Sequence, residues 1–315
     1  MSIAVGVCWR LGTVSSVECS LVVSVLWRIP LLELRLSRYS RPSTVDFIFD
    51  SVGIKQFCEG RYPLKVLLHE MSWPEAKEYF ADNDIAILPV GSNEQHGHAN
   101  PLGTDHLIAK SIAVETANRT GVVCLQVVPF GVSSHHKQFW GTIFISPKTF
   151  KAYVKETCLS LEYFGVRKIV VVNGHGGNLA ALSELGRELR EEGVFLSVFQ
   201  WWPAALKLLP NFFVPDERRH AGAEETSMNL ALHPELVNMT KALNEELSRH
   251  VLQVEGLTLP LSTVDETKSG VYGKQSTASA EKGKEVFESV VNELVKHVFL
   301  LKKARIEDLA QKPKA

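Results

Sequence analysis

The sequence predicts an α/β protein built as a three-layer α/β/α sandwich, in which helices cover both faces of a mainly parallel central sheet. Short apolar runs alternate along the chain with longer segments of helical periodicity. The run 168–172 is almost entirely β-branched, as expected of a strand that is covered on both faces. Two clusters of polar, chemically active side chains directly follow apolar runs, at the position where ligands gather in parallel sheets.

Helices and strands alternate regularly from residue 65 onward. Residues 71–82 predict a helix, because Ser72 is a suitable N-cap and a proline follows at an early position that tolerates it. The apolar run 84–90 is bounded by polar and glycine positions and predicts a buried strand. Residues 104–120 carry apolar side chains at helical spacing, and the apolar run 122–130 predicts a second strand.

A loop and another helix–strand pair are expected next. Residues 131–145 are predicted to be a loop. Ser146 is an N-cap with a proline directly after it, which predicts a helix that ends near residue 164, before Gly165. The third predicted strand is the β-branched run 168–172.

The fourth strand is predicted over 194–201. Residues 178–192 before it predict a helix, with Asn178 as its cap. Residues 203–219 contain three prolines and are expected to be loop-like.

The C-terminal part is predicted to be less regular. Residues 221–232 predict a helix, residues 234–280 carry little pattern, and residues 277–301 predict a final helix. We therefore expect one domain over residues 65–303, followed by a loose polar tail at 304–315.

Residues 1–64 form an atypical N-terminal extension. Two interpretations are open: an extra segment that packs on the domain, or an over-extended gene model whose working protein starts near Lys65 or Met71. The second is favoured. The apolar stretch 21–34 is interrupted by charged residues and a proline and is too short to span a bilayer, so no membrane association is expected.

Composition excludes several classes of function. The chain has 34 Lys and Arg against 35 Asp and Glu, so it lacks the basic field of a nucleic-acid-binding protein. Its five cysteines are odd in number and show no CxxC pair, which argues against a disulfide framework or a zinc–thiolate site. A reducing, cytoplasmic location is expected.

The first polar cluster contains Glu94, His96 and Asp105. Glu94 and His96 are one residue apart, so in an extended segment their side chains point to the same side and suit one metal or two adjacent ones. Asp105 lies at the predicted start of the next helix, where a carboxylate can bridge two cations. The alternative is that Asp105 only caps the helix and His96 is a loop histidine; the combination favours a metal site.

Two later segments add further candidates. His175 follows the third strand between glycines that let the backbone turn sharply. Glu224 and Glu225 lie in the first turn of the helix after His220, where acidic residues are also favoured electrostatically without any other role.

These segments resemble the creatininase (creatinine amidohydrolase) family. The similar motifs share order and length with that family and are Gly91–Gly97, Pro101–Asp105, Asn173–Asn178, His220–Ser227, Gly270–Gly273 and Ala278–Gly283. The resemblance covers roughly Met71 to Leu301 and implies a creatininase-like α/β/α fold with two divalent metals per subunit. Zinc is favoured, with manganese or iron(II) as alternatives.

The resemblance also implies roles for individual residues. Glu94, Asp105 and His175 would hold one metal, and His96 would hold the other, with Asp105 bridging. His220 matches a proton-shuttling histidine. Creatininase proper takes its last ligand from a Glu two residues after the motif histidine, where this chain has Gly177.

The missing ligand is expected from elsewhere. Variants of the family with two glycines in that motif take the carboxylate from the Glu-Thr-Ser motif, which implies Glu225 as both ligand and catalytic residue. His98, His136, Trp140 and Trp201 are weaker candidates for the substrate pocket, and the tryptophans suit ordinary packing equally well.

The expected activity is metal-dependent hydrolysis of a C–N amide bond, in a cyclic amide or a formamide, with a hydroxide bridging the two metals. Within the family, a formamide deformylase of flavin or deazaflavin biosynthesis and a peptide-processing enzyme are alternatives. A phosphoesterase and a catalytically inactive oligomeric subunit are alternatives of other classes. The resemblance implies a homo-oligomer, a hexamer, that acts on a small-molecule amide.

Overall fold

The computed structural model describes residues 65–248 and 256–309, together with four short strands nearer the N-terminus. These strands form two antiparallel pairs, β1 (Gly6–Trp9) with β2 (Cys19–Val22) and β3 (Ile48–Asp50) with β4 (Gly53–Lys55). The chain divides into two compact units, Met1–Pro63 and Leu64–Ala315. The remaining expectations for residues 1–64 and for 310–315 lie outside the described residues.

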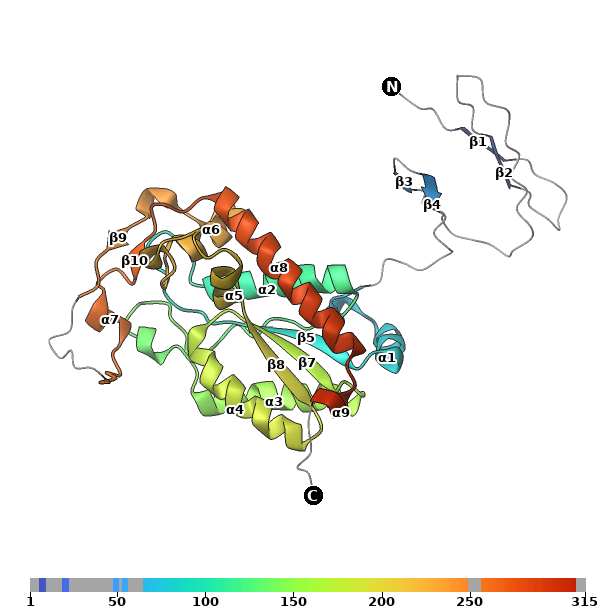
Figure 1. Cartoon of the computed structure of the whole chain (residues 1–315), viewed down its shortest axis with the longest axis horizontal. Helices are drawn as coiled ribbons and strands as arrows, with labels where there is room; N and C mark the ends of the chain where they lie inside the picture. The colour runs from blue at the N-terminus through green and yellow to red at the C-terminus, as the bar shows by residue number, and fades with distance from the viewer. Residues whose placement is uncertain are drawn as a thin grey trace. The chain divides into compact units, whose positions relative to one another are not determined.

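The second unit is organised around a parallel sheet of four strands in the order β6-β5-β7-β8 (Figure 1). β5 (Ile85–Val90) pairs along its whole length with β7 (Lys168–Asn173), and β7 pairs likewise with β8 (Phe195–Gln200). β6 (Val123–Cys124) is a short edge strand beside β5. Both faces of β5 and β7 are buried, which explains their continuous apolar sequences.

Helices cover both faces of this sheet and complete the three predicted layers (Figure 1). On one face, the side chains of Ile85, Ile87, Val170 and Val172 pack against helices that are mostly late in the chain. These helices are α2 (Thr104–Thr120), α5 (Trp201–Leu208), α6 (Ala223–Leu232) and α8 (Ala280–Lys303). The opposite face packs against α1 (Trp73–Asp82), α3 (Pro147–Tyr163) and α4 (Leu179–Glu191).

The remaining elements are short and lie between these helices and strands along the chain or at its ends. They are the 3-10 helices η1 (Leu68–Glu70), η2 (Ser134–His136), η3 (Gly176–Asn178), η4 (Pro215–Glu217), η5 (Pro234–Leu236) and η6 (Met239–Lys241), the paired strands β9 (Asn244–Glu245) and β10 (Gly273–Lys274), and the single-turn helices α7 (Thr263–Glu266) and α9 (Ile306–Leu309).

Two sequence-based predictions of local structure were wrong. Only Val123–Cys124 of the predicted strand 122–130 pairs regularly; the chain leaves β5 at the exposed Gln126 and returns through a single bridge at Val128. The predicted loop 203–219 contains part of α5, because Pro203 falls in the first helical turn, where its missing N–H breaks no hydrogen bond. Within residues 304–315, the short helix α9 is preceded by Arg305, which forms an ion pair with Asp308 of that helix.

No helix within the described ranges is long and apolar enough to cross a bilayer.

Candidate metal centre

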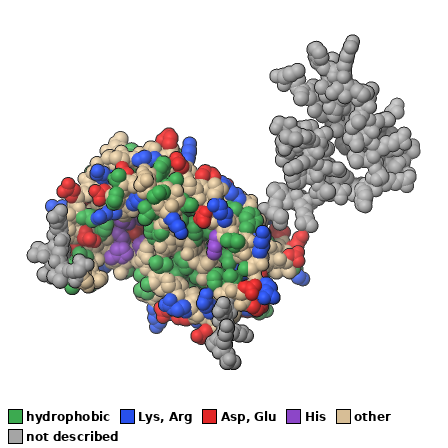
Figure 2. Space-filling view, viewed as in Figure 1, with side chains coloured by type: hydrophobic (Ala, Val, Ile, Leu, Met, Phe, Trp, Pro, Cys, Tyr) green, Lys and Arg blue, Asp and Glu red, His purple; other side chains and the backbone are tan. Residues whose placement is uncertain are grey.

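The predicted ligands gather beyond the carboxyl ends of β5 and β7. Glu94 and His96 lie on the loop after β5, and His175 directly follows β7. Asp105 enters from the first turn of α2, and Glu225 from the first turn of α6. Figure 2 shows histidine side chains gathered at the surface on the side of the molecule where these strands end.

A close backbone contact brings Asp105 to His175. A Cβ atom on Gly174 would lie 2.2 Å from the Asp105 carbonyl oxygen, so a larger residue would push α2 away from the end of β7. The α2 cap residue is Gly103, and the Asp105 side chain points to the histidines instead of capping the helix.

The first group of possible ligands is Glu94, Asp105 and His175, all of them buried. His175 Nδ1 lies 3.1 Å from Glu94 Oε2 and 3.1 Å from Asp105 Oδ2. Its other nitrogen, Nε2, donates to the Val132 carbonyl at 3.1 Å. In the neutral ring the lone pair on Nδ1 therefore faces the two carboxylates.

The second group is His96, His220 and Glu225. His96 Nε2 lies 3.0 Å from Asp105 Oδ1 and 3.7 Å from Glu225 Oε2. Because His96 Nδ1 donates to the Glu94 carbonyl, the lone pair of the neutral ring again faces carboxylates. Asp105 thus touches both groups, one through each oxygen.

The buried acceptors of this cluster lack donors. Both carboxylate oxygens of Glu94, Oδ2 of Asp105 and Nε2 of His96 are buried without a hydrogen-bond partner in the described part of the chain. Lone pairs that face one another in a dry site require a positive charge between them. Mixed imidazole and carboxylate donors suit Zn²⁺, Mn²⁺ or Fe²⁺, so these residues fit the divalent cations expected from the sequence.

Without a metal, protons supply that charge. Burial by itself would lower the pKa of His96, but the adjacent Asp105 carboxylate raises this pKa to about 10. Burial alone would also lower the pKa of His175, but the Glu94 carboxylate raises this pKa well above its usual value. Burial alone would raise the pKa of Asp105, yet the charges of His96 and His175 hold it well below its usual range.

Gly177 cannot be replaced by the glutamate of creatininase proper. A Cβ atom there would lie 2.3 Å from the Val132 carbonyl oxygen and 2.5 Å from His175 Nε2. Glu225 supplies a carboxylate to this part of the cluster from α6 instead. Its Oε2 accepts from the Ala221 N–H at 2.6 Å, and Ala221 takes a left-handed conformation (φ 56°) that directs this N–H.

The neighbouring Glu224 has a different role. Its carboxylate, 2% exposed, accepts from Arg218 Nη1 at 2.8 Å, and Arg218 also donates to the carbonyls of Leu209 and Phe213. Burial raises the pKa of Glu224 to about 7. The pair joins α6 to the segment that leads to His220, which leaves Glu225 as the glutamate that faces the histidines.

Two further predicted site residues also reach the cluster. His220 Nδ1 lies 3.8 Å from Glu94 Oε1, and its Nε2 donates to the Gln95 carbonyl at 2.9 Å. Burial and the neighbouring His96 lower the pKa of His220 well below its usual value. His136 Nε2 lies 3.3 Å from Glu94 Oε1, so this 3% exposed side chain contacts a predicted ligand.

The other pocket candidates lie farther out. His98 is exposed and takes part in none of the possible ligand groups among the described residues. Trp140 is 98% exposed, on the loop whose Gly141 carbonyl accepts from the Asn93 side chain. Trp201, the first residue of α5, is 1% exposed and lies in the apolar core on the α2 face of the sheet, as the packing alternative expects.

Sequence reasoning missed residues that support the ligands. The amide of Gln95 contacts His136, His220 and the Gly270 carbonyl. Asn178 was predicted as a helix cap but makes no cap bond; it accepts from Val132 N–H and donates to the Gly91 carbonyl, tying three loops together. Gln95 lies within the first motif, Gly91–Gly97, and this position is the sequence signal that could have identified it as a site residue.

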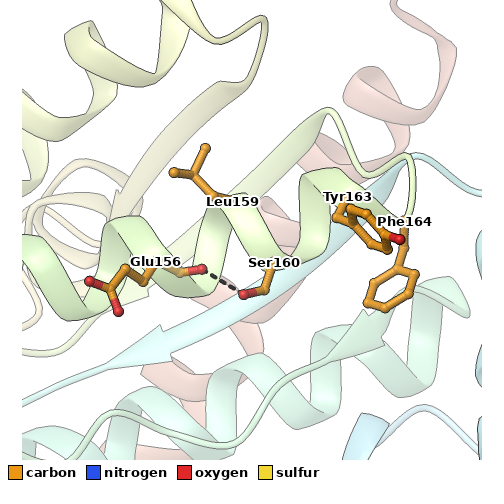
Figure 3. A pocket seen from close by; sticks show the side chains of 5 residues that line it. All are labelled: Glu156, Leu159, Ser160, Tyr163 and Phe164. Carbon is orange, nitrogen blue, oxygen red and sulfur yellow. Dashed lines mark hydrogen bonds between the residues drawn. The ribbon is translucent and has the colours of Figure 1, made fainter.

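A separate hollow lies on the outer face of α3 (Figure 3). Its lining is Glu156, Leu159, Ser160, Tyr163 and Phe164. It is next to the C-terminal end of α3, which leads into the start of β7. The hollow therefore lies at the end of the sheet opposite to the ligands, which follow the carboxyl ends of the strands.

A parallel α/β/α sheet with buried carboxylates and imidazoles at its strand ends is consistent with a hydrolase that has a binuclear metal site. The family model described as creatininase, creatinine amidohydrolase, matches residues 69–298. The chain belongs to the creatininase family.

Individual relatives agree with this assignment. A creatinine amidohydrolase of Pseudomonas putida is 29% identical over 245 residues, which cover 72% of this chain and 93% of its own. A mycofactocin precursor peptide peptidase of Mycolicibacterium smegmatis is 33% identical over 224 residues, 66% of this chain and 81% of its own. A 2-amino-5-formylamino-6-ribosylaminopyrimidin-4(3H)-one 5'-monophosphate deformylase of Methanothermus fervidus is 28% identical over 167 residues, 48% of this chain and 56% of its own.

Solved structures carry the same fold. A crystal structure of creatinine amidohydrolase superimposes with a TM-score of 0.66 and 26% identity, covering 76% of this chain and 99% of that one. Two other creatininase structures are described as a Mn form and as a Zn–Zn type. The chain is thus a creatininase-family hydrolase whose buried His, Glu and Asp groups are consistent with a binuclear metal site.

Proposed function

We propose that this protein is a two-metal amidohydrolase that hydrolyses a C–N amide bond in a small cyclic amide or formamide. Glu94, Asp105 and His175 would hold one cation. His96, Asp105 and Glu225 would hold the other, with Asp105 shared. The observation that carries the proposal is the contact of Asp105 with both His96 and His175, among buried polar atoms that make no hydrogen bond within the described part of the chain.

When bound, two such cations supply a water nucleophile at neutral pH and polarise the amide carbonyl. The chain contributes the proton transfer. His220 Nε2 is engaged by the Gln95 carbonyl, so Nδ1 is the atom free to take a proton from water and give it to the leaving nitrogen. Its lowered pKa keeps the ring neutral, and therefore able to accept, at pH 7.

A peptide substrate is the second candidate. Exposed apolar side chains adjoin the ligand loops: Leu102, Phe130, Trp140, Ile143 and Phe144. Backbone bridges join Ile143 to Asn93 and Phe144 to Gly131, so these side chains lie beside the motif that carries Glu94. Such a rim suits an extended peptide better than a compact polar ring.

The experiment is a substrate panel with one variant and one control. The purified protein, loaded with Zn²⁺ or Mn²⁺, is assayed on creatinine, on a formamidopyrimidine, on a short peptide and on an aryl phosphate. Asp105→Ala should abolish turnover of the accepted amide, whereas Asp82→Ala, an exposed change at the end of α1, should not. Turnover of the aryl phosphate alone, or unchanged turnover by Asp105→Ala, would refute the proposal.

Two further expectations concern the assembly, which family membership supports, and the location of the protein. We propose a homo-oligomer, a hexamer, which light scattering after size-exclusion chromatography measures directly. The buried thiols of Cys124 and Cys158, both free, fit a reducing cytoplasmic location.

A further inference from the structure

A third group of possible metal ligands consists of Glu94, His136 and His220. A histidine at this position has one of two roles. If its lone pair points to Glu94, it serves as a metal ligand; if its N–H does, it serves as a donor to the carboxylate. The choice depends on which nitrogen of His136 carries the proton, and the surrounding hydrogen bonds decide it.

The side-chain amide of Gln95 has a fixed orientation. Its oxygen accepts from the Gly97 N–H at 3.0 Å, and its nitrogen donates to the Gly270 carbonyl at 3.1 Å. Both partners are backbone groups, which cannot exchange donor for acceptor. A flipped amide would set N–H against N–H and oxygen against oxygen, and Gln95 is only 4% exposed, so no bulk water would relieve that repulsion.

Two ring nitrogens compete for the second amide hydrogen of Gln95, His220 Nε2 at 2.8 Å and His136 Nδ1 at 3.0 Å. His220 Nε2 also lies 2.9 Å from the Gln95 carbonyl oxygen, which can only accept, so it carries its own hydrogen and the amide hydrogen is left to His136 Nδ1. The hydroxyl of Thr263 lies 2.8 Å from the same Nδ1 and is also able to donate. Nδ1 of His136 is thus an acceptor, and the ring proton lies on Nε2.

We propose that Gln95 sets the tautomer of His136, and that His136 is a positioning residue which turns an N–H toward Glu94 instead of ligating a metal. The N–H would face Glu94 Oε1, 3.3 Å from Nε2, and leave Oε2 directed at His175. The third group would then bind no cation. The part of this inference that concerns metal affinity rests on the proposed function; the tautomer does not.

The direct test is NMR of the metal-free protein labelled with ¹⁵N in its histidines. The ring nitrogens of His136, assigned by the loss of their signals in His136→Gln, should show a proton on Nε2 and a lone pair on Nδ1. His297 on α8 contacts Ser197 and is the internal reference. A proton on Nδ1 of His136 in the native protein would overturn the proposal.

Variants at Gln95 and Thr263 test the cause. Gln95→Glu removes the donor and should move the His136 proton to Nδ1, whereas Thr263→Val leaves Gln95 in place and should not. Zinc affinity should fall by about 10–100-fold in Gln95→Glu and in His136→Leu. If Gln95→Glu does not fold, the native spectrum and Thr263→Val still decide, because a tautomer that switches in Thr263→Val contradicts the assignment to Gln95.

Zinc loading separates this inference from the proposed function. The His136 Nε2 proton should persist when zinc binds, and its loss would identify His136 as a ligand and refute the inference. If the Nε2 proton is present but no metal binds and no amide is cleaved, the tautomer assignment stands and the amidohydrolase proposal fails.

Discussion

Asp105 Oδ1 lies 3.0 Å from His96 Nε2, although Asp105 belongs to the first turn of α2 and His96 to the loop after β5. α2 also closely approaches the chain just beyond β7, at Gly174. The other oxygen of Asp105 faces His175, so one carboxylate spans both groups of possible ligands.

Glu225 should be essential for binding the second metal, and a glutamate introduced by Gly177→Glu should not replace it. Glu225→Gln should weaken the second metal by at least about 10-fold, because one anionic ligand is removed. Gly177→Glu should destabilise the fold, since its Cβ would overlap the Val132 carbonyl. Metal content and thermal unfolding of the two single variants and of the double variant measure both effects; a double variant with native metal content would contradict this account.

Metal binding should release protons. At pH 7.5 His96, with a pKa of about 10, and His175, with a raised pKa, are protonated in the metal-free protein and must be neutral to bind a cation. Loading both sites should release about two protons per chain, so metal affinity should rise with pH between about 7 and 10. Calorimetry in buffers of different ionisation enthalpy counts these protons, and a count of zero would argue against the two histidines as ligands.

Trp140 should affect substrate binding but not stability. It is 98% exposed, so Trp140→Ala should change the free energy of unfolding by less than about 0.5 kcal/mol. If its indole contacts the substrate, KM should rise while kcat changes little. Trp73→Ala, which removes another exposed tryptophan (78% exposed, on α1), is the control. Equal kinetic effects of the two variants would exclude a role for Trp140 in the pocket.

Glu245 should make stability depend on acid pH. Partial burial would raise its pKa, but the hydroxyl of Ser269 and the N–H of Lys268 lower it to about 2. A folded-state pKa below the unfolded value gives stability that is present above about pH 4.5 and is lost as the pH falls toward 2. Glu245→Gln should reduce Tm at pH 6 and flatten its fall between pH 4.5 and 2; parallel Tm curves for the two proteins would contradict this.

The strands and the main ligands could be predicted because the signals are local. Glu94, His96 and His175 each follow an apolar run that pairs in the central sheet, and topology then requires those strand ends to meet. For Trp201 the sequence left a pocket role and ordinary packing open, because an amphipathic side chain gives no local sign of whether it points inward or outward.

The residues that support the ligands could not be predicted in the same way. Thr263 and Gly270 reach Gln95 and His136 from a segment with little helix or strand period, and their place depends on long-range packing. Pro203 misled the prediction of α5 because proline is a break signal inside a helix but is tolerated in the first turn.

The central claim is that Glu94, His96, Asp105, His175 and Glu225 hold two cations. The most direct measurement is anomalous diffraction from crystals of the zinc-loaded protein, paired with metal analysis in solution. The account predicts two peaks, each beside Asp105, and about two metals per chain, falling to one or none in Asp105→Ala. An absence of metal after loading, or peaks that do not adjoin Asp105, would contradict it.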